Sequence, residues 1–217
     1  MKRTLIFSLL ILSLESFGQT QNLKEKTIVI KFSPLCLIDP NYPAIQLGAE
    51  VKLANSLSYQ QEAGYIFRQT YVNDRWVNGG GFKIRSEIKS YKIITKNSDV
   101  LNGTYLAIEP FYTYTYFYRE ADFRLDDGST QKDEHKIIKH IIGINAKIGY
   151  QKIFKSGILL EFYVGIGIKY RKTTYTENEY EGKKAIFPAD YIFAGSEREG
   201  ESIVPNLPMS IKIGYAF

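Results

Sequence analysis

The two histidines of the chain, His135 and His140, lie in the segment "HKIIKH" and are the first candidates for chemistry. Histidine is the side chain most often used as a general acid or base, and it needs a serine or an acidic partner within hydrogen-bond reach. The segment supplies no neighbouring serine. On an extended chain, two residues five apart point to opposite faces, so they cannot share a metal ion. We therefore predict no catalytic residue and no metal site, with His135 as the candidate if catalysis occurs.

Two further features, a glycine run and a lone cysteine, also lack the context that chemistry requires. "NGGG" at 78–81 opens no predicted helix, so we expect a flexible loop there and not a phosphate site. Cys36 is the one cysteine and can form no internal disulfide, which leaves it as a small apolar strand residue. The formal net charge of +5 is evenly scattered, which argues against nucleic acid as a partner. No cofactor is predicted.

The elements that must position these residues are strands. Apolar and polar residues alternate with period two along most of the chain, and turn-like stretches separate the alternating segments. In the clearest segment, Ile158, Leu160 and Phe162 alternate with Glu161 and Tyr163. We predict eight strands, over residues 27–38, 44–54, 57–70, 82–94, 104–119, 136–150, 158–175 and 203–217.

The first residues form a different kind of segment. Lys2 and Arg3 precede an apolar run from Leu5 to Leu14, and small residues follow. This pattern predicts a secretory signal peptide over residues 1–18, cleaved to leave one domain over residues 19–217. The run is too short for a membrane helix, because spanning takes roughly 20 apolar residues.

The linkers between the strands are sorted by length. Those after the second, fourth and sixth segments are short, whereas residues 120–135 and 176–202 form the longest gaps. Outer-membrane barrels combine short periplasmic turns with long outer loops in this way. We therefore predict an all-β fold, an eight-stranded antiparallel up-and-down transmembrane β-barrel. A secreted soluble β-sandwich, acting as a binding module, is the alternative.

The alternation assigns charged residues to the barrel interior. Because an unpaired buried charge is strongly unfavourable, we expect these residues to pair with one another. Tyrosines near the strand ends, including Tyr114, Tyr116, Tyr118, Tyr170 and Tyr175, are expected at the membrane interfaces. The predicted inward charges are Lys31, Glu50, Lys52, Glu62, Arg68, Lys83, Arg85, Glu87, Lys89, Glu109, Lys147, Glu161, Lys169 and Lys212.

The chain resembles the small OmpA-like and OmpX-like barrels, and more closely the outer-membrane barrel proteins of Bacteroidota-type bacteria. The segments "IIGINAKIGYQKIF", "GILLEFYVGIGIKYR" and "IKIGYAF" carry the likeness. The resemblance implies the outer membrane of a Gram-negative bacterium, contact with its lipid and lipopolysaccharide, and recognition of the last strand, ending at Phe217, by the assembly machinery. It brings no catalytic residues.

Together these features predict a monomeric structural or surface-interaction barrel that is neither an enzyme nor an open pore. Eight strands leave an interior that side chains just fill. The charged outer loops are expected to be mostly a solvated surface, and recognition of a surface ligand by residues 129–134 or 177–194 is the alternative. A lipid-modifying outer-membrane enzyme is the other alternative, and it would depend on His135.

Overall fold

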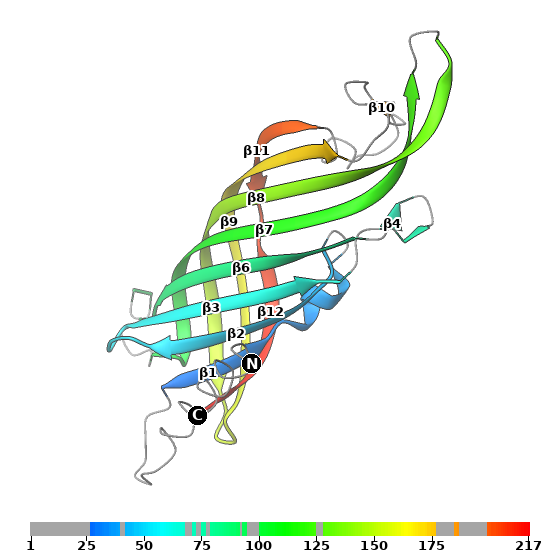
Figure 1. Cartoon of the computed structure of the whole chain (residues 1–217). Coiled ribbons are helices and arrows are strands. Elements are labelled where there is room, and N and C mark those ends of the chain that lie inside the picture. Colours follow the sequence, from blue (N-terminus) through cyan, green and yellow to red (C-terminus); the bar gives the residue numbers. More distant parts are fainter. Residues whose placement is uncertain are drawn as a thin grey trace, which may run out of the picture.

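The computed structural model describes residues 27–39, 42–67, 71–72, 75–76, 79–91, 93–94, 100–124, 128–176, 185–186 and 199–217 (Figure 1). The predicted signal peptide, Arg68 and residue 78 lie outside these ranges. None of the described residues form a helix that is long and apolar enough to cross a membrane. The elements are β1 (Ile28–Phe32), η1 (Pro34–Ile38), β2 (Ala44–Lys52), β3 (Leu57–Ile66), β4 (Tyr71–Val72), β5 (Arg75–Trp76), β6 (Gly79–Ser90), β7 (Gly103–Arg124), β8 (Thr130–Ile153), β9 (Ile158–Thr176), β10 (Ala185–Ile186), β11 (Gly200–Asn206) and β12 (Met209–Ala216).

The sheet is a closed eight-stranded antiparallel up-and-down barrel, which confirms the predicted fold class. Strands β1, β2, β3, β6, β7, β8, β9 and β12 pair in this order, and β12 returns to β1. Closure uses four residue pairs, from Val29 with Ala216 to Phe32 with Ile213. Closure on itself leaves the barrel without a long free edge, which is how a sheet satisfies its backbone groups internally.

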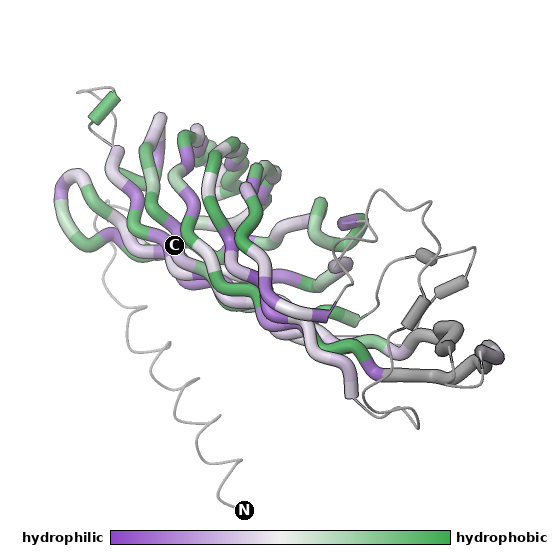
Figure 2. Tube along the Cα trace, turned by 90° about the horizontal axis from the view of Figure 1, so that it is seen from above, coloured by the Kyte–Doolittle hydropathy of each residue, from purple (hydrophilic) through white to green (hydrophobic). Residues whose placement is uncertain are grey.

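The alternation places polar residues inside and apolar residues outside. In β12, Lys212 is fully buried and Ser210 is 8% exposed, whereas Ile213 and Tyr215 are 46% and 47% exposed. The predicted inward orientation of Lys212 is therefore confirmed. Figure 2, viewed from above, shows hydropathy changing between neighbouring residues along the strands. The fold buries its charges and exposes its aliphatic side chains, which is the reverse of a soluble domain.

The last barrel strand is longer than β12 alone. β11 and β12 both pair with β9 in one continuous register, from Gly200 opposite Thr173 to Tyr215 opposite Ile158. The ladder is interrupted where Pro208 lacks an N–H, although its carbonyl still accepts a hydrogen bond of 2.8 Å from the Gly165 amide. The strand predicted over 203–217 is confirmed and begins three residues earlier.

The first strand is shorter than predicted. β1 ends at Phe32, and residues 34–38 form the 3-10 helix η1, so the second half of the strand predicted over residues 27–38 was wrong. Pro34 cannot donate to a strand ladder, and its fixed φ suits the first turn of a helix. Cys36 consequently lies in this helix and not in a strand, with its Sγ 3.4 Å from Oε1 of Gln46.

The glycine run is also part of a strand. Gly79, Gly80 and Gly81 begin β6 and pair with residues 115–117 of β7, so the predicted loop was wrong for these three positions. A Cβ on Gly81 would lie 2.1 Å from the carbonyl oxygen of Tyr114, and one on Gly79 would lie 2.5 Å from that of Tyr116. Glycine is required here because β6 approaches the β7 backbone too closely for a side chain.

The loop predicted at 120–135 is mostly a hairpin. β7 continues to Arg124 and β8 starts at Thr130, with paired residues throughout. Gly128 has a φ of +82°, which a turn glycine adopts without strain. The alternation signal fails in this hairpin because backbone pairing continues where the sequence has no regular apolar face. Figure 1 shows the hairpin extending beyond the rest of the barrel.

Candidate functional site

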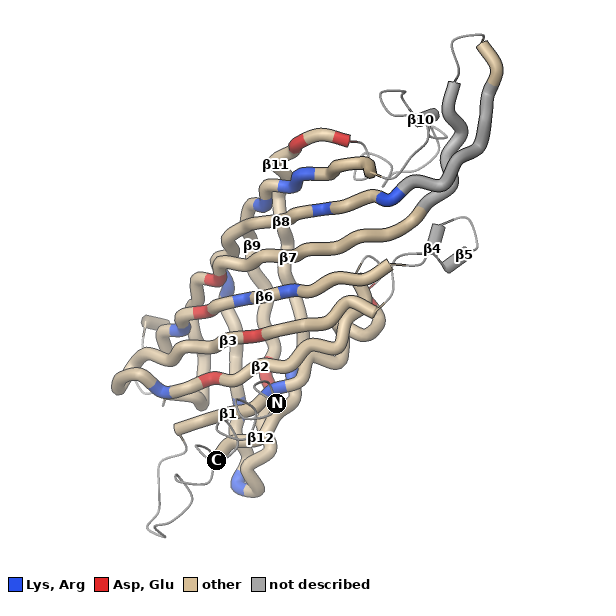
Figure 3. The backbone as a smooth tube through the Cα atoms, in the orientation of Figure 1, with Lys and Arg blue, Asp and Glu red and all other residues tan. Residues whose placement is uncertain are grey.

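The barrel interior holds a compact group of paired charges, which we call the charge network. Its members come from all eight strands of the barrel, and Figure 3 shows positions of both signs distributed over these neighbouring strands. Apart from Arg85, whose side chain is 20% exposed, none is more than 3% exposed. The network consists of Lys31, Lys89, Lys147, Lys212 and Arg85 with Glu50, Glu62, Glu87, Glu109 and Glu161.

Glu161 lies at the centre of this network. It forms ion pairs with Lys31, with Lys89 at 2.8 Å and with Lys212 at 3.8 Å. Lys31 and Lys89 also contact Glu50, the second carboxylate of this half, with Lys89 Nζ at 3.2 Å from its Oε2. Each carboxylate of this half lies near two or more ammonium groups. Every charged member of this half therefore has at least one partner of opposite charge.

The other half joins β3, β6, β7, β8 and β12. Lys212 pairs with Glu62, and Lys147 pairs with Glu109 and, at 2.8 Å, with Glu87. Arg85 adds a longer pair of 3.6 Å to Glu109. Positive and negative members are equal in number, so the expectation that inward charges pair is confirmed for these residues.

Tyrosines complete the network. The hydroxyl of Tyr91 donates to Glu50 at 2.7 Å, and that of Tyr105 donates to Glu161. Lys147 lies over the ring of Tyr163, with Nζ 4.0 Å from the centroid. The sequence alternation placed Tyr163 inside, but it singled out neither Tyr91 nor Tyr105. Tyr105, Ala107 and Glu109 alternate along one face of their strand. Because Glu109 was predicted to face inward, the same alternation could have predicted that Tyr105 faces inward too.

Amides from β2, β3 and β8 serve as further hydrogen-bond partners. Gln60 accepts from Lys31 at 2.7 Å and from Lys89 at 2.8 Å, and Gln151 accepts from Lys31 at 2.6 Å. Gln46 donates to Glu62. Because these residues carry no formal charge, they were absent from the predicted inward charges, although Gln60 and Gln151 accept hydrogen bonds from lysines of the network and Gln46 donates one to Glu62.

An apolar cluster closes the barrel below the network. It consists of Val29, Leu101, Leu159 and Ala216, each no more than 2% exposed. Partly buried Val100 and Ile153 pack against it. With charges paired above and apolar side chains packed below, the described interior has the filled cross-section expected for eight strands.

On the other side of the network, η1 and the segment after it turn side chains inward. Lys83 pairs with Asp39 at 3.2 Å, donates to the Tyr42 carbonyl at 2.7 Å and lies 5.7 Å from the Tyr42 ring centroid. Burial raises the pKa of Tyr42 to about 12, so its hydroxyl stays neutral at physiological pH. The predicted inward Lys83 is therefore paired, with a partner from outside the strands.

The histidines are not brought together. His140 faces outward and is exposed, and its Nδ1 lies 2.7 Å from the Tyr112 hydroxyl. His135 lies opposite Arg119 in the β7–β8 ladder, and its side chain is outside the described set. Within the residues that the structure describes, no group of three or more His, Cys, Asp or Glu could hold a metal ion. That the chain is not an enzyme stays a prediction.

Outward tyrosines follow β7 toward its hairpin. The ring centroids of Tyr114 and Tyr116 are 6.3 Å apart, and those of Tyr116 and Tyr118 are 6.4 Å apart. Tyr170 also faces outward. Tyr175 is the exception, because it shares the inward face of β9 with Thr173, so its predicted place at the outer surface was wrong.

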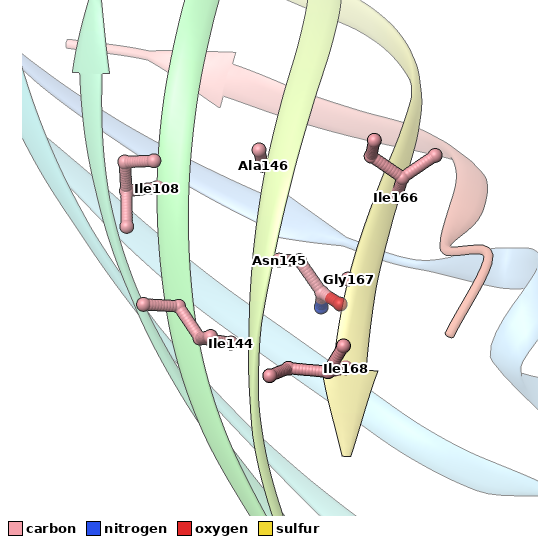
Figure 4. Close-up of a pocket in the computed structure, with 7 residues that line it drawn as sticks. All are labelled: Ile108, Ile144, Asn145, Ala146, Ile166, Gly167 and Ile168. Atoms are coloured by element: carbon pink, nitrogen blue, oxygen red, sulfur yellow. The ribbon is translucent and has the colours of Figure 1, made fainter. Parts of the chain in front are cut away.

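The outer face of β7, β8 and β9 carries an apolar hollow of about 380 Å³ (Figure 4). Two neighbouring hollows of about 430 and 330 Å³ share Ala146 with it. Ala146 is small among large neighbours, and this leaves the surface indented. Such an indentation accommodates hydrocarbon and offers almost no polar partner. The hollow is lined by Ile108, Ile144, Asn145, Ala146, Ile166, Gly167 and Ile168.

The site and the fold together define an eight-stranded antiparallel β-barrel with a charged, filled interior and an apolar outer face. No family model, no curated protein and no solved structure matches the chain.

Proposed function

We propose that the protein is an integral outer-membrane β-barrel of structural or surface-interaction type, without an open pore. The observation that carries this proposal is the inverted distribution of side chains around a closed sheet. Outward Ile45, Ile142 and Ile166 are 50%, 58% and 69% exposed, while inward Glu50, Lys89 and Glu161 are fully buried.

This distribution costs free energy in water. Removing one large aliphatic side chain from water stabilises by about 1.5–3 kcal/mol, and the outward face of the barrel carries many such side chains. In hydrocarbon they would be solvated by lipid, and closure leaves the spanning sheet without the edge that a bilayer excludes. A soluble binding module would leave this surface in contact with water, so a membrane location explains the surface better.

The resemblance to OmpA-like and OmpX-like barrels, recognition by the assembly machinery, and contact with lipopolysaccharide belong to the same proposal. They rest on the sequence segments given above. The surface-interaction part rests on the outer end of the barrel, where the β7–β8 hairpin extends beyond the other strands.

Fractionation tests the location. Expressed with its own N-terminal segment in a Gram-negative host, the protein should be recovered with outer membranes and require detergent for extraction. It should migrate faster on a gel before boiling than after, since an unboiled barrel stays compact. Recovery in the aqueous fraction without detergent would contradict the proposal.

Conductance tests the absence of a pore. The paired charges and the apolar cluster fill the described interior, so protein reconstituted in planar bilayers should give negligible ion current. A large porin reconstituted under the same conditions supplies the positive control. Steady large openings of the purified protein would show that the barrel is a channel.

A further inference from the structure

A row of outward polar side chains crosses the barrel wall at the end that carries the β7–β8 hairpin. His140 of β8 lies directly opposite Lys172 of β9, and Lys172 lies directly opposite Glu201 of β11. All three side chains are exposed. We call these three residues the polar row.

The polar row carries charges of both signs. Lys172 Nζ lies 3.3 Å from Oε1 of Glu201, and both side chains are 55% exposed. Tyr170 forms a hydrogen bond with the same carboxylate. His140 adds a further polar group, with its Nδ1 2.7 Å from the Tyr112 hydroxyl. An exposed cation beside an exposed carboxylate complements a ligand that also carries both charges.

The apolar hollow at Ala146 lies on the same strands, farther from the hairpin end. Ala146 of β8 lies directly opposite Ile108 of β7 and Ile166 of β9. Figure 4 shows its small side chain between these two larger ones. The hollow of about 380 Å³ and its two neighbours of about 430 and 330 Å³ all include Ala146, so they form one indentation that suits hydrocarbon.

The spacing between the polar row and the hollow matches one leaflet of a bilayer. His140 and Ala146 are six residues apart on β8, which corresponds to about 20 Å along a strand. Barrel strands tilt by about 35–45°, so the separation along the membrane normal is about 15 Å. The hydrocarbon core of a bilayer is about 30 Å thick, and one leaflet supplies half of it. A lipid with its headgroup at the polar row therefore has an acyl chain over the hollow.

We infer that the polar row and the hollow together bind one lipid of the phosphoethanolamine class. Lys172 and His140 contact the phosphate, and Glu201 accepts hydrogen bonds from the primary ammonium. A choline headgroup has no N–H to donate and a glycerol headgroup has no cation, so neither suits Glu201 as well. The inference deepens the proposed function by naming a partner lipid, and it rests on that function for the location in a membrane.

Native mass spectrometry of the full chain in a nonionic detergent tests the choice of headgroup. The probes are phosphatidylethanolamine, phosphatidylcholine and phosphatidylglycerol with identical acyl chains. Phosphatidylethanolamine should bind about fivefold more tightly than the other two lipids, because only its headgroup satisfies both charges of the row. Equal binding of the three lipids, or tighter binding of either control lipid, would overturn the inference.

The matched variants for the headgroup are Lys172→Gln and Lys152→Gln. Both remove one exposed positive charge, but Lys152 lies opposite Leu160, at the other end of the β8–β9 ladder. Lys172→Gln should weaken phosphatidylethanolamine binding by about tenfold, because it removes a charge-assisted hydrogen bond to the phosphate. Lys152→Gln should leave the affinity unchanged. Equal losses in the two variants would show attraction by net charge and no site.

The matched variants for the acyl chain are Ala146→Phe and Ala49→Phe. Both place a ring on an outward alanine, but Ala49 of β2 lines none of the three hollows. Ala146→Phe should weaken binding of all three lipids several-fold, and Ala49→Phe should not. Faster gel migration before boiling than after shows that each variant has folded. Unchanged binding by folded Ala146→Phe would overturn the assigned chain site.

Membrane fractionation is a separate result. A membrane-bound protein without a preference for phosphatidylethanolamine refutes this inference alone. Recovery of the protein in the aqueous fraction refutes the proposed location.

Discussion

At the scale of single residues, Glu161 shows how this interior stays stable. A carboxylate transferred out of water is costly, and the cost is offset only when its partners are well placed. Glu161 has Lys31, Lys89 and Lys212 within ion-pair distance and accepts a hydrogen bond from Tyr105. Loss of its charge would leave these three cations with too few partners.

We therefore predict that Glu161→Gln lowers the free energy of unfolding by about 3–5 kcal/mol, the range for breaking a buried pair. Urea unfolding of the barrel in lipid vesicles, followed by tryptophan fluorescence, measures the change. Glu201→Gln is the matched control, because Glu201 pairs with Lys172 on the exposed surface, where ion pairs contribute little. Equal stability of Glu161→Gln and the parent protein would contradict the assigned role of the network.

Cys36 gives a second prediction at this scale. Burial raises the pKa of its thiol, and the reactive species is the thiolate, so alkylation by iodoacetamide at pH 8 should be slow in the folded barrel. Urea should restore the rate of an ordinary cysteine. The chain has one cysteine, so the mass of the whole protein reports this site alone. Rapid alkylation without denaturant would show that η1 does not cover the thiol.

Period-two alternation predicted the inward orientation of all ten members of the charge network, because parity on a strand decides the face, but it missed the buried Lys139. It could not predict the partners, since these depend on the register between strands that are distant in sequence: Lys31 meets Glu161 only because the barrel closes.

At the scale of elements, the start of β6 depends on glycine. Gly81 lies against the backbone of β7, whereas a Cβ on neighbouring Gly80 would meet atoms no closer than the Tyr116 hydroxyl at 3.4 Å. Two adjacent glycines therefore differ in what a methyl group would do, and this difference follows from the strand pairing.

We predict that Gly81→Ala destabilises the barrel by about 1–3 kcal/mol, the usual cost of overpacking, because β6 must move away from β7. Gly80→Ala should be close to neutral. Urea midpoints of the two variants give the comparison, and amide exchange of residues 113–117 should increase in Gly81→Ala alone. Similar urea midpoints for Gly81→Ala and Gly80→Ala would contradict the close approach of β6 to β7 at Gly81.

Strand positions were predictable wherever both faces had a distinct environment, as in β9 and β12. Prediction failed at the ends of strands. η1 replaces the second half of the first predicted strand because Pro34 stops the ladder, although the apolar residues continue to Ile38. The β7–β8 hairpin was missed for the opposite reason, since its strands continue beyond the regular apolar alternation.

At the scale of the whole molecule, closure of the sheet pairs the first strand, β1, with the last strand, β12. β1 contributes five residues, and four of them pair with β12. The even number of strands allowed closure to be predicted, because an antiparallel ring requires it. The precise seam could not be predicted, since it depends on where β1 ends.

The seam supplies the last prediction. Val29 and Ala216 are directly paired, and both are buried, at 0% and 2% exposure. The Ala216 amide donates to the Gly157 carbonyl on the β9 side, so Val29 and Ala216 form a non-hydrogen-bonded pair with Cα atoms about 4.5 Å apart. This separation fits a disulfide.

In a Cys36→Ser background, Val29→Cys with Ala216→Cys should therefore form an intramolecular disulfide on mild oxidation, detected by mass spectrometry of a tryptic digest. Val29→Cys with Ile141→Cys is the control, since Ile141 is similarly buried but lies on β8, which pairs with β7 and β9 and not with β1. A disulfide in the control, or none in the first pair, would contradict the closed order of strands from β1 around to β12.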